Sequence, residues 1–106
     1  MHQDILLVFS TCPERATAER IATILVERKL AACVSVGGAV QSHYVWKDQR
    51  EVSEEIPLII KTSRERYAAL EKTLVELHPY ELPEIVAVPV ERGLPAYLDW
   101  VQSCTV

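Results

Sequence analysis

The order of apolar segments is the feature that most restricts the fold of this chain. Residues 5–9 form a continuous apolar run, which predicts a strand covered on both faces. An amphipathic helix follows and ends near Lys29. Residues 50–62 form another strand with an apolar centre, and a second helix follows it. The apolar residues of that second helix recur at helical spacing, and they are Tyr67, Leu70, Leu74 and Leu77.

A long strand is predicted between these two strand–helix pairs, over residues 31–46. It contains the pair Gly37-Gly38, which indicates a bulge or a bend. Residues 47–49 form a tight polar turn, and the chain then returns in the strand over residues 50–62. Pro57 lies within that returning strand, which favours an edge position or a bulge there.

A fourth strand over residues 85–88 and a short helix starting near Pro95 complete the pattern. The order is therefore β-α-β-β-α-β with one added helix, which is typical of the split βαβ, ferredoxin-like arrangement. We predict an α+β ferredoxin-like sandwich with an extended hairpin between its second and third strands. A single domain is expected over residues 1–106.

Both long helices are predicted to begin at a capping box, Thr11 with Glu14 and Thr62 with Glu65. Right-handed crossovers predict that the first and third strands are parallel neighbours. Both helix N-termini would then share one end of the sheet, where Lys61 and Thr62 could bind an anion. Alternatively, the Lys61 side chain covers the end of the sheet with its aliphatic stem.

The predicted hairpin is longer than the helical layer. The first helix of about 17 residues spans about 25 Å, whereas a strand of about 16 residues reaches about 50 Å. The overhang carries Tyr44, Val45 and Trp46. Because an isolated ribbon with exposed aromatic side chains is marginally stable, we expect identical subunits to bury it in a closed homo-oligomer.

Composition excludes several classes of protein. The 106 residues are 49% apolar and 25% charged, which is typical of a globular chain and argues against disorder. A net charge of −4 argues against nucleic acid as the main partner. No secretory signal is visible, and every apolar run is shorter than the roughly 18 residues that span a bilayer. We therefore expect a cytoplasmic protein with no membrane partner.

The densest polar segment is residues 78–84. Its side chains His78, Glu81 and Glu84 could bind a divalent metal. A tight metal site usually needs three or four ligands, however, and this segment has only one histidine. Alternatively, this segment ends the second helix, and its two prolines make a rigid connection to the next strand. The acidic residues within 51–55 are expected to form a solvated face. No nucleophile–base pair or nucleotide-binding motif occurs, so no enzymatic activity is predicted.

Several segments together carry a resemblance to a known family. They are Ala16-Thr17-Ala18 with Ile21-Ala22, Leu30-Ala31-Ala32-Cys33-Val34, Ser42-His43-Tyr44-Val45-Trp46, Ile60-Lys61-Thr62, the segment from His78 to Glu84, and Gly93 followed by Tyr97-Leu98-Asp99-Trp100. In this order they resemble the CutA divalent-cation tolerance proteins. The resemblance implies a ferredoxin-like subunit in a tight homotrimer, in which the long hairpin pairs with neighbouring subunits. It also implies tolerance of copper and other divalent metals, without an enzymatic reaction.

The resemblance transfers few residues. His78 matches the histidine of the family's His-Pro-Tyr motif, a proposed copper ligand. A cysteine that some members carry on the first strand is replaced by Ser10, with Cys12 two residues further on. A second histidine found in some members corresponds to Leu77. The metal ligands predicted for Cu²⁺ or another divalent ion are His78, Glu81, Glu84 and Cys12.

Two functions follow from these expectations. The first is a trimeric protein that binds divalent metal ions and acts in metal tolerance. The second is a sensor or scaffold similar in architecture to the PII signalling proteins, binding a small anion between subunits near Lys61 and Thr62.

Overall fold

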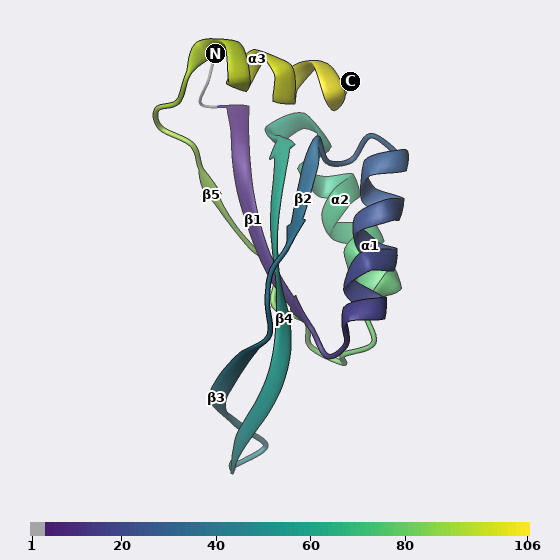
Figure 1. Cartoon of the computed structure of the whole chain (residues 1–106), viewed down its shortest axis with the longest axis vertical. Helices are drawn as coiled ribbons and strands as arrows, with labels where there is room; N and C mark the ends of the chain where they lie inside the picture. Colours follow the sequence, from purple (N-terminus) through teal and green to yellow (C-terminus); the bar gives the residue numbers. More distant parts are fainter. Residues whose placement is uncertain (1–3) are drawn as a thin grey trace.

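The structure, a computed structural model, describes residues 4–106. The elements follow the predicted order, with the long second strand divided in two: β1 (Ile5–Cys12), α1 (Arg15–Glu27), β2 (Cys33–Val36), β3 (Val40–Trp46), β4 (Gln49–Ser63), α2 (Arg64–Leu77), β5 (Val86–Pro89) and α3 (Pro95–Cys104). They form the predicted α+β ferredoxin-like sandwich (Figure 1). Within residues 4–106, no helix is long and apolar enough to cross a lipid bilayer.

Four strands form the main sheet in the order β2-β4-β1-β5, and its neighbouring pairs are antiparallel. Ile5 of β1 pairs with Ser63 of β4, and Cys12 pairs with Ile56. The prediction of a parallel central pair was therefore wrong. The crossover through α1 makes β2 parallel to β1, and the hairpin then reverses the chain. For this reason β4 lies between β1 and β2 and runs antiparallel to both.

The two long helices consequently begin at opposite ends of the sheet, α1 beyond the end of β1 and α2 beyond the end of β4. Their N-cap residues are Glu14 and Ser63, and neither makes a side-chain capping hydrogen bond. The predicted capping boxes were wrong, because Thr11 and Thr62 are still paired within strands. The geometric basis for an anion site between two helix N-termini is thereby removed.

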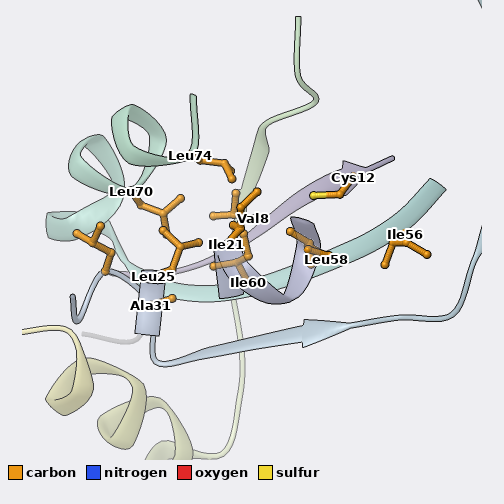
Figure 2. Close-up of a cluster of buried hydrophobic side chains, with 12 residues drawn as sticks. Val8, Cys12, Ile21, Leu25, Ala31, Ile56, Leu58, Ile60, Leu70 and Leu74 are labelled. Carbon is orange, nitrogen blue, oxygen red and sulfur yellow. The ribbon is translucent and has the colours of Figure 1, made fainter. Parts of the chain in front are cut away.

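The main core lies between the sheet and the layer made by α1 and α2. Val8 of β1 and Ile60 of β4 pack with Ile21, Leu25 and Leu70 of the two helices, and all five are fully buried. Figure 2 shows these side chains meeting between the strands and the helices. Alternation along each strand directs one set of residues into this core and the other set to the opposite face.

The opposite face of the sheet is only partly covered within one chain. α3 packs over Ile5 through Leu98 at one end. Further along, Leu7 and Phe9 are half-buried, and Ile59 is 41% exposed. The prediction of a first strand covered on both faces therefore holds only at the end near α3.

A one-residue bulge separates β2 from β3. Residues 37–39 stand opposite only residues 56–57 of β4, which confirms the predicted bulge at the glycines and the proline. The Gly37 N–H donates to the Pro57 carbonyl oxygen at 2.9 Å. A Cβ on Gly37 would lie 2.9 Å from Pro57 Cγ. Only a residue without a side chain allows the two strands to approach this closely.

The hairpin of β3 and β4 extends beyond the helices, as predicted, along the longest dimension of the molecule, 44 Å against 25 and 23 Å (Figure 1). Its turn residues, Lys47 and Asp48, both have positive φ, at 52° and 66°. This geometry is typical of a two-residue type I′ turn, whose twist matches that of the flanking strands. The apolar side chains that the hairpin exposes are Val40, Tyr44, Val45, Trp46 and Val52.

Candidate functional site

A cavity of about 470 Å³ lies where the hairpin leaves the sandwich and meets the segment that follows α2. The cavity is lined by three acidic and three aromatic side chains: Glu55, Glu81, Glu84, Tyr44, Trp46 and Tyr80. We call it the acidic cavity. Thr11 at the end of β1 and His43 of the hairpin also line it. Two of the four predicted metal ligands, Glu81 and Glu84, are therefore brought to one place.

The prediction that the acidic residues within 51–55 form a solvated face was wrong for Glu55. Glu55 is only 7% exposed, and its Oε2 accepts hydrogen bonds from the hydroxyls of Tyr80 at 2.8 Å and Thr11 at 3.3 Å. The acidic pattern of residues 51–55 is that of a solvated strand, and only the register of β4 distinguishes Glu55 from exposed Glu54. A signal was available in its position, because Glu55 directly precedes the apolar part of the strand.

The carboxylate of Glu55 changes the acidity of its neighbours. Burial, together with this negative charge and the hydrogen bond to it, raises the pKa of the Tyr80 hydroxyl well above its ordinary range. The phenol therefore stays protonated and continues to donate its hydrogen bond to Glu55. No cationic side chain among the described residues is paired with this buried carboxylate. A buried, unpaired negative charge favours the approach of a cation.

His78 lies behind the wall of the cavity as the C-cap residue of α2. Its ring is buried, and Nε2 lies 2.7 Å from the Thr11 carbonyl oxygen, to which it must donate. Its Nδ1 accepts the Tyr80 backbone N–H at 3.1 Å. Both ring nitrogens are therefore engaged in a neutral imidazole. His78 therefore ends the helix, as in the alternative interpretation of residues 78–84. Neither of its ring nitrogens has a lone pair available for a metal in this conformation.

Cys12 is also behind the wall and is fully buried, with Sγ 3.9 Å from His78 Nε2. Burial, and next the charge of Glu55, raises the pKa of this thiol to about 11. At neutral pH it is therefore a protonated thiol, whereas metal ligation requires the thiolate. Neither Cys12 nor His78 lines the acidic cavity, and their role as metal ligands stays a prediction.

Glu81 and Glu84 belong to the connection between α2 and β5. Glu81 forms an exposed ion pair with Lys47 at the hairpin turn, with 3.7 Å between Nζ and Oε1. Carboxylate oxygens are suitable ligands for divalent cations. Among residues 4–106, however, no three histidine, cysteine or acidic side chains converge closely enough to hold a metal ion. One chain therefore supplies donors to the acidic cavity but does not form a complete metal centre.

Lys61 and Thr62 lie near the far end of β4, away from the acidic cavity. The Thr62 hydroxyl is buried and donates to the Leu30 carbonyl oxygen at 2.6 Å. Lys61 Nζ donates to the Tyr97 hydroxyl of α3 at 3.1 Å and lies 5.3 Å from the centroid of that ring. These contacts match the alternative in which Lys61 covers the end of the sheet. The anion site predicted there stays a prediction, without support from converging helices.

Fold and cavity together define the class of protein: a ferredoxin-like α+β chain whose long hairpin overhangs the sandwich and has carboxylates gathered at its base. The chain belongs to the CutA1 divalent ion tolerance family, whose family model matches residues 6–104. This confirms the resemblance found in the sequence. The family is one of tolerance and binding proteins and is not a known family of enzymes.

Relatives from several kingdoms support this membership. The chain is 45% identical over 93 residues to the CutA homolog of Xenopus laevis and 42% identical over 97 residues to mouse CutA. It spans 62% and 55% of the lengths of these two proteins, and the matches cover 88% and 92% of this chain. The divalent-cation tolerance protein CutA of Archaeoglobus fulgidus is 39% identical, over 91% of this chain and 93% of the relative.

Solved structures of relatives share the whole fold. CutA from Xylella fastidiosa superposes with a TM-score of 0.95 at 44% identity, covering 97% of this chain and 99% of that one. CutA1 from Shewanella sp. SIB1 superposes with a TM-score of 0.94 at 44% identity, covering 99% of this chain and 98% of that one. The A. fulgidus structure has a TM-score of 0.92 at 36% identity and covers 96% of this chain and 99% of that one. That protein is described as a periplasmic divalent cation tolerance protein.

Proposed function

We propose that this chain is a non-enzymatic protein that binds divalent metal ions, Cu²⁺ among them, in the acidic cavity. We further propose that it works as a cytoplasmic homotrimer, in which a neighbouring subunit completes the ligand set. The observation that supports this most strongly is the buried carboxylate of Glu55, which shares its cavity with Glu81 and Glu84. The divalent ion tolerance of the family supports the choice of cation.

The charge of the cavity favours cations over anions. Three carboxylates line it, and Lys47 pairs with only one of them, Glu81. Concave sites lined by one sign of charge concentrate counter-ions, especially where the walls are apolar. In this proposal Glu81 and Glu84 are the metal ligands, because they lie outside the hydrogen-bond network that holds Glu55. His78 positions the segment that carries them.

The homotrimer, which the family resemblance implies, is supported by the surfaces that one chain leaves open. The sheet face opposite α1 and α2 exposes Ile59, Val86 and Val88, and the hairpin exposes Val45 and Val52. Contiguous apolar surfaces of this kind mark protein–protein contacts. A neighbouring hairpin can also bring donors to a cavity that is incomplete within one chain.

The cytoplasmic location is supported by cysteine usage. Cys12, Cys33 and Cys104 are all free. Free thiols are typical of proteins in reducing compartments.

Calorimetric titration of the chelator-treated protein with Cu²⁺ tests the metal proposal. The Glu81→Gln, Glu84→Gln double variant should bind at least about tenfold more weakly, because each charged contact contributes about 1.5–3 kcal/mol. Glu54→Gln is the matched control, since Glu54 is an exposed carboxylate beside Glu55 that does not line the cavity. Absence of stoichiometric heat, or equal affinities in all variants, would contradict the proposal.

A further inference from the structure

The rim of the acidic cavity already holds an alkylammonium group of the protein itself. Lys47 Nζ lies 5.6 Å from the centroid of the Trp46 ring and 3.7 Å from Glu81 Oε1. The ammonium is thus placed between an aromatic face and a carboxylate, the two groups that recognise organic ammonium ions. The lysine side chain is 69% exposed and is not among the residues that line the cavity, so it leaves the cavity unfilled.

We propose that the acidic cavity binds a small aliphatic diamine in its dicationic form. The metal proposal uses the same cavity, but amine binding requires no metal and stands or falls independently of it. The position of Lys47 shows, within this chain, how one ammonium group of such a ligand is recognised.

The walls of the cavity also suit an organic cation. Tyr44, Trp46 and Tyr80 line it, and aromatic faces attract ammonium groups while accommodating methylene chains. The volume of about 470 Å³ is in the range of small-molecule sites and is far larger than one metal ion needs.

Glu55 is the group that would bind a second ammonium deeper in the acidic cavity. Both hydrogen bonds that this carboxylate accepts, from Tyr80 and Thr11, end on Oε2. Oε1 is therefore the oxygen that remains to accept an N–H from a ligand. Because Lys47 already pairs with Glu81, the carboxylates left for two cationic ends are Glu84 and Glu55, which matches a diamine and not a monoamine.

The test is calorimetric titration of the chelator-treated protein, without metal, using 1,4-diaminobutane. 1-Aminobutane and 1,4-butanediol serve as singly charged and neutral probes. We expect the diamine to bind at least about tenfold more tightly than the monoamine, and the diol not to bind. Glu55→Gln should weaken diamine binding by about tenfold or more. The exposed neighbour Glu54→Gln serves as the control and should stay within about twofold.

A second pair of variants keeps the test decisive if Glu55→Gln fails to fold. Trp46→Ala, which removes an aromatic wall, should weaken binding, whereas Trp100→Ala on α3 should not. The proposal is overturned if diamine and diol give the same heats, or if the cavity variants and their controls bind alike. Because metal is absent throughout, diamine binding can fail while Cu²⁺ binding succeeds, and the reverse result is equally distinguishable.

Discussion

At the scale of single residues, His78 joins the end of α2 to the end of β1. Its two ring nitrogens connect the Thr11 carbonyl oxygen with the Tyr80 backbone N–H. The hydroxyl of Tyr80 then holds Glu55. One buried imidazole therefore determines where the wall of the acidic cavity lies.

The structural role of His78 predicts a large loss of stability on its removal. His78→Ala leaves a buried carbonyl and a backbone N–H without partners, so the free energy of unfolding should fall by about 2–4 kcal/mol. His43→Ala, an exposed histidine of the hairpin, should change it by less than about 0.5 kcal/mol. Urea unfolding at equal protein concentrations measures both. Equal stabilities would show that the imidazole network is dispensable.

Cys12 provides a prediction about pH. The thiol has an ordinary pKa of 9.0, and in the folded chain it is raised to about 11. Burial therefore contributes stability that is fully present below pH 9 and is lost as the pH rises through 11. At pH 8, iodoacetamide should modify half-buried Cys33 and Cys104 well before Cys12. Peptide mass spectrometry follows the three sites, and equal rates would contradict the burial of Cys12.

At the scale of elements, the bulge at residues 37–39 connects the sandwich with the hairpin. It allows β4 to pair with β2 and then with β3, as one continuous strand of 15 residues. Extra residues of this kind bend a strand and increase its local twist. Val40, the first residue after the bulge, pairs with Glu55, so the bulge also sets the position of Glu55 in the acidic cavity.

The two adjacent glycines of this bulge should differ when each is replaced by alanine. In Gly37→Ala the new Cβ meets Pro57 Cγ at 2.9 Å, so a loss of about 1–3 kcal/mol is expected. Gly38 has no atom within 4 Å of such a Cβ, and Gly38→Ala should stay within about 0.5 kcal/mol. Thermal unfolding compares the pair. A destabilised Gly38 variant beside an unchanged Gly37 variant would contradict the close approach of Gly37 to Pro57.

Local sequence patterns were sufficient to predict most helices and strands. They were not sufficient to predict the directions of the strands or the acidic cavity. Gly37, Gly38 and Pro57 predicted the bulge, because their effects on the backbone are local. The antiparallel direction of β4 depends on how a crossover and a hairpin combine in three dimensions. Burial of Glu55 likewise depends on Tyr80, a residue 25 positions away that only the folded chain brings near.

At the scale of the whole molecule, two surfaces of one chain lack cover. The open sheet face carries Ile59 and half-buried Phe9, and the hairpin carries Val45, which is 66% exposed. The apolar run of β1 predicted cover on both faces, and one chain provides it only near α3. Association of subunits would supply the remainder and stabilise a hairpin that has little support of its own.

The proposed homotrimer predicts a light-scattering mass of about 36 kDa, three times the 12.0 kDa of one chain. Val45→Glu should shift this mass toward 12 kDa, because it places a charge within the proposed subunit contact. Val26→Glu, an exposed position on α1 away from the hairpin, should leave the mass unchanged. A wild-type mass near 12 kDa at micromolar concentration would contradict the trimer.

The most direct test of cation binding in the acidic cavity is anomalous diffraction at the copper edge, from crystals of the chain soaked in Cu²⁺. The predicted result is an anomalous peak within the cavity, bonded to carboxylate oxygens of Glu81 or Glu84, with His78 still hydrogen-bonded to Thr11. A peak on His78 and Cys12 with the cavity empty, or no ordered peak at all, would contradict it.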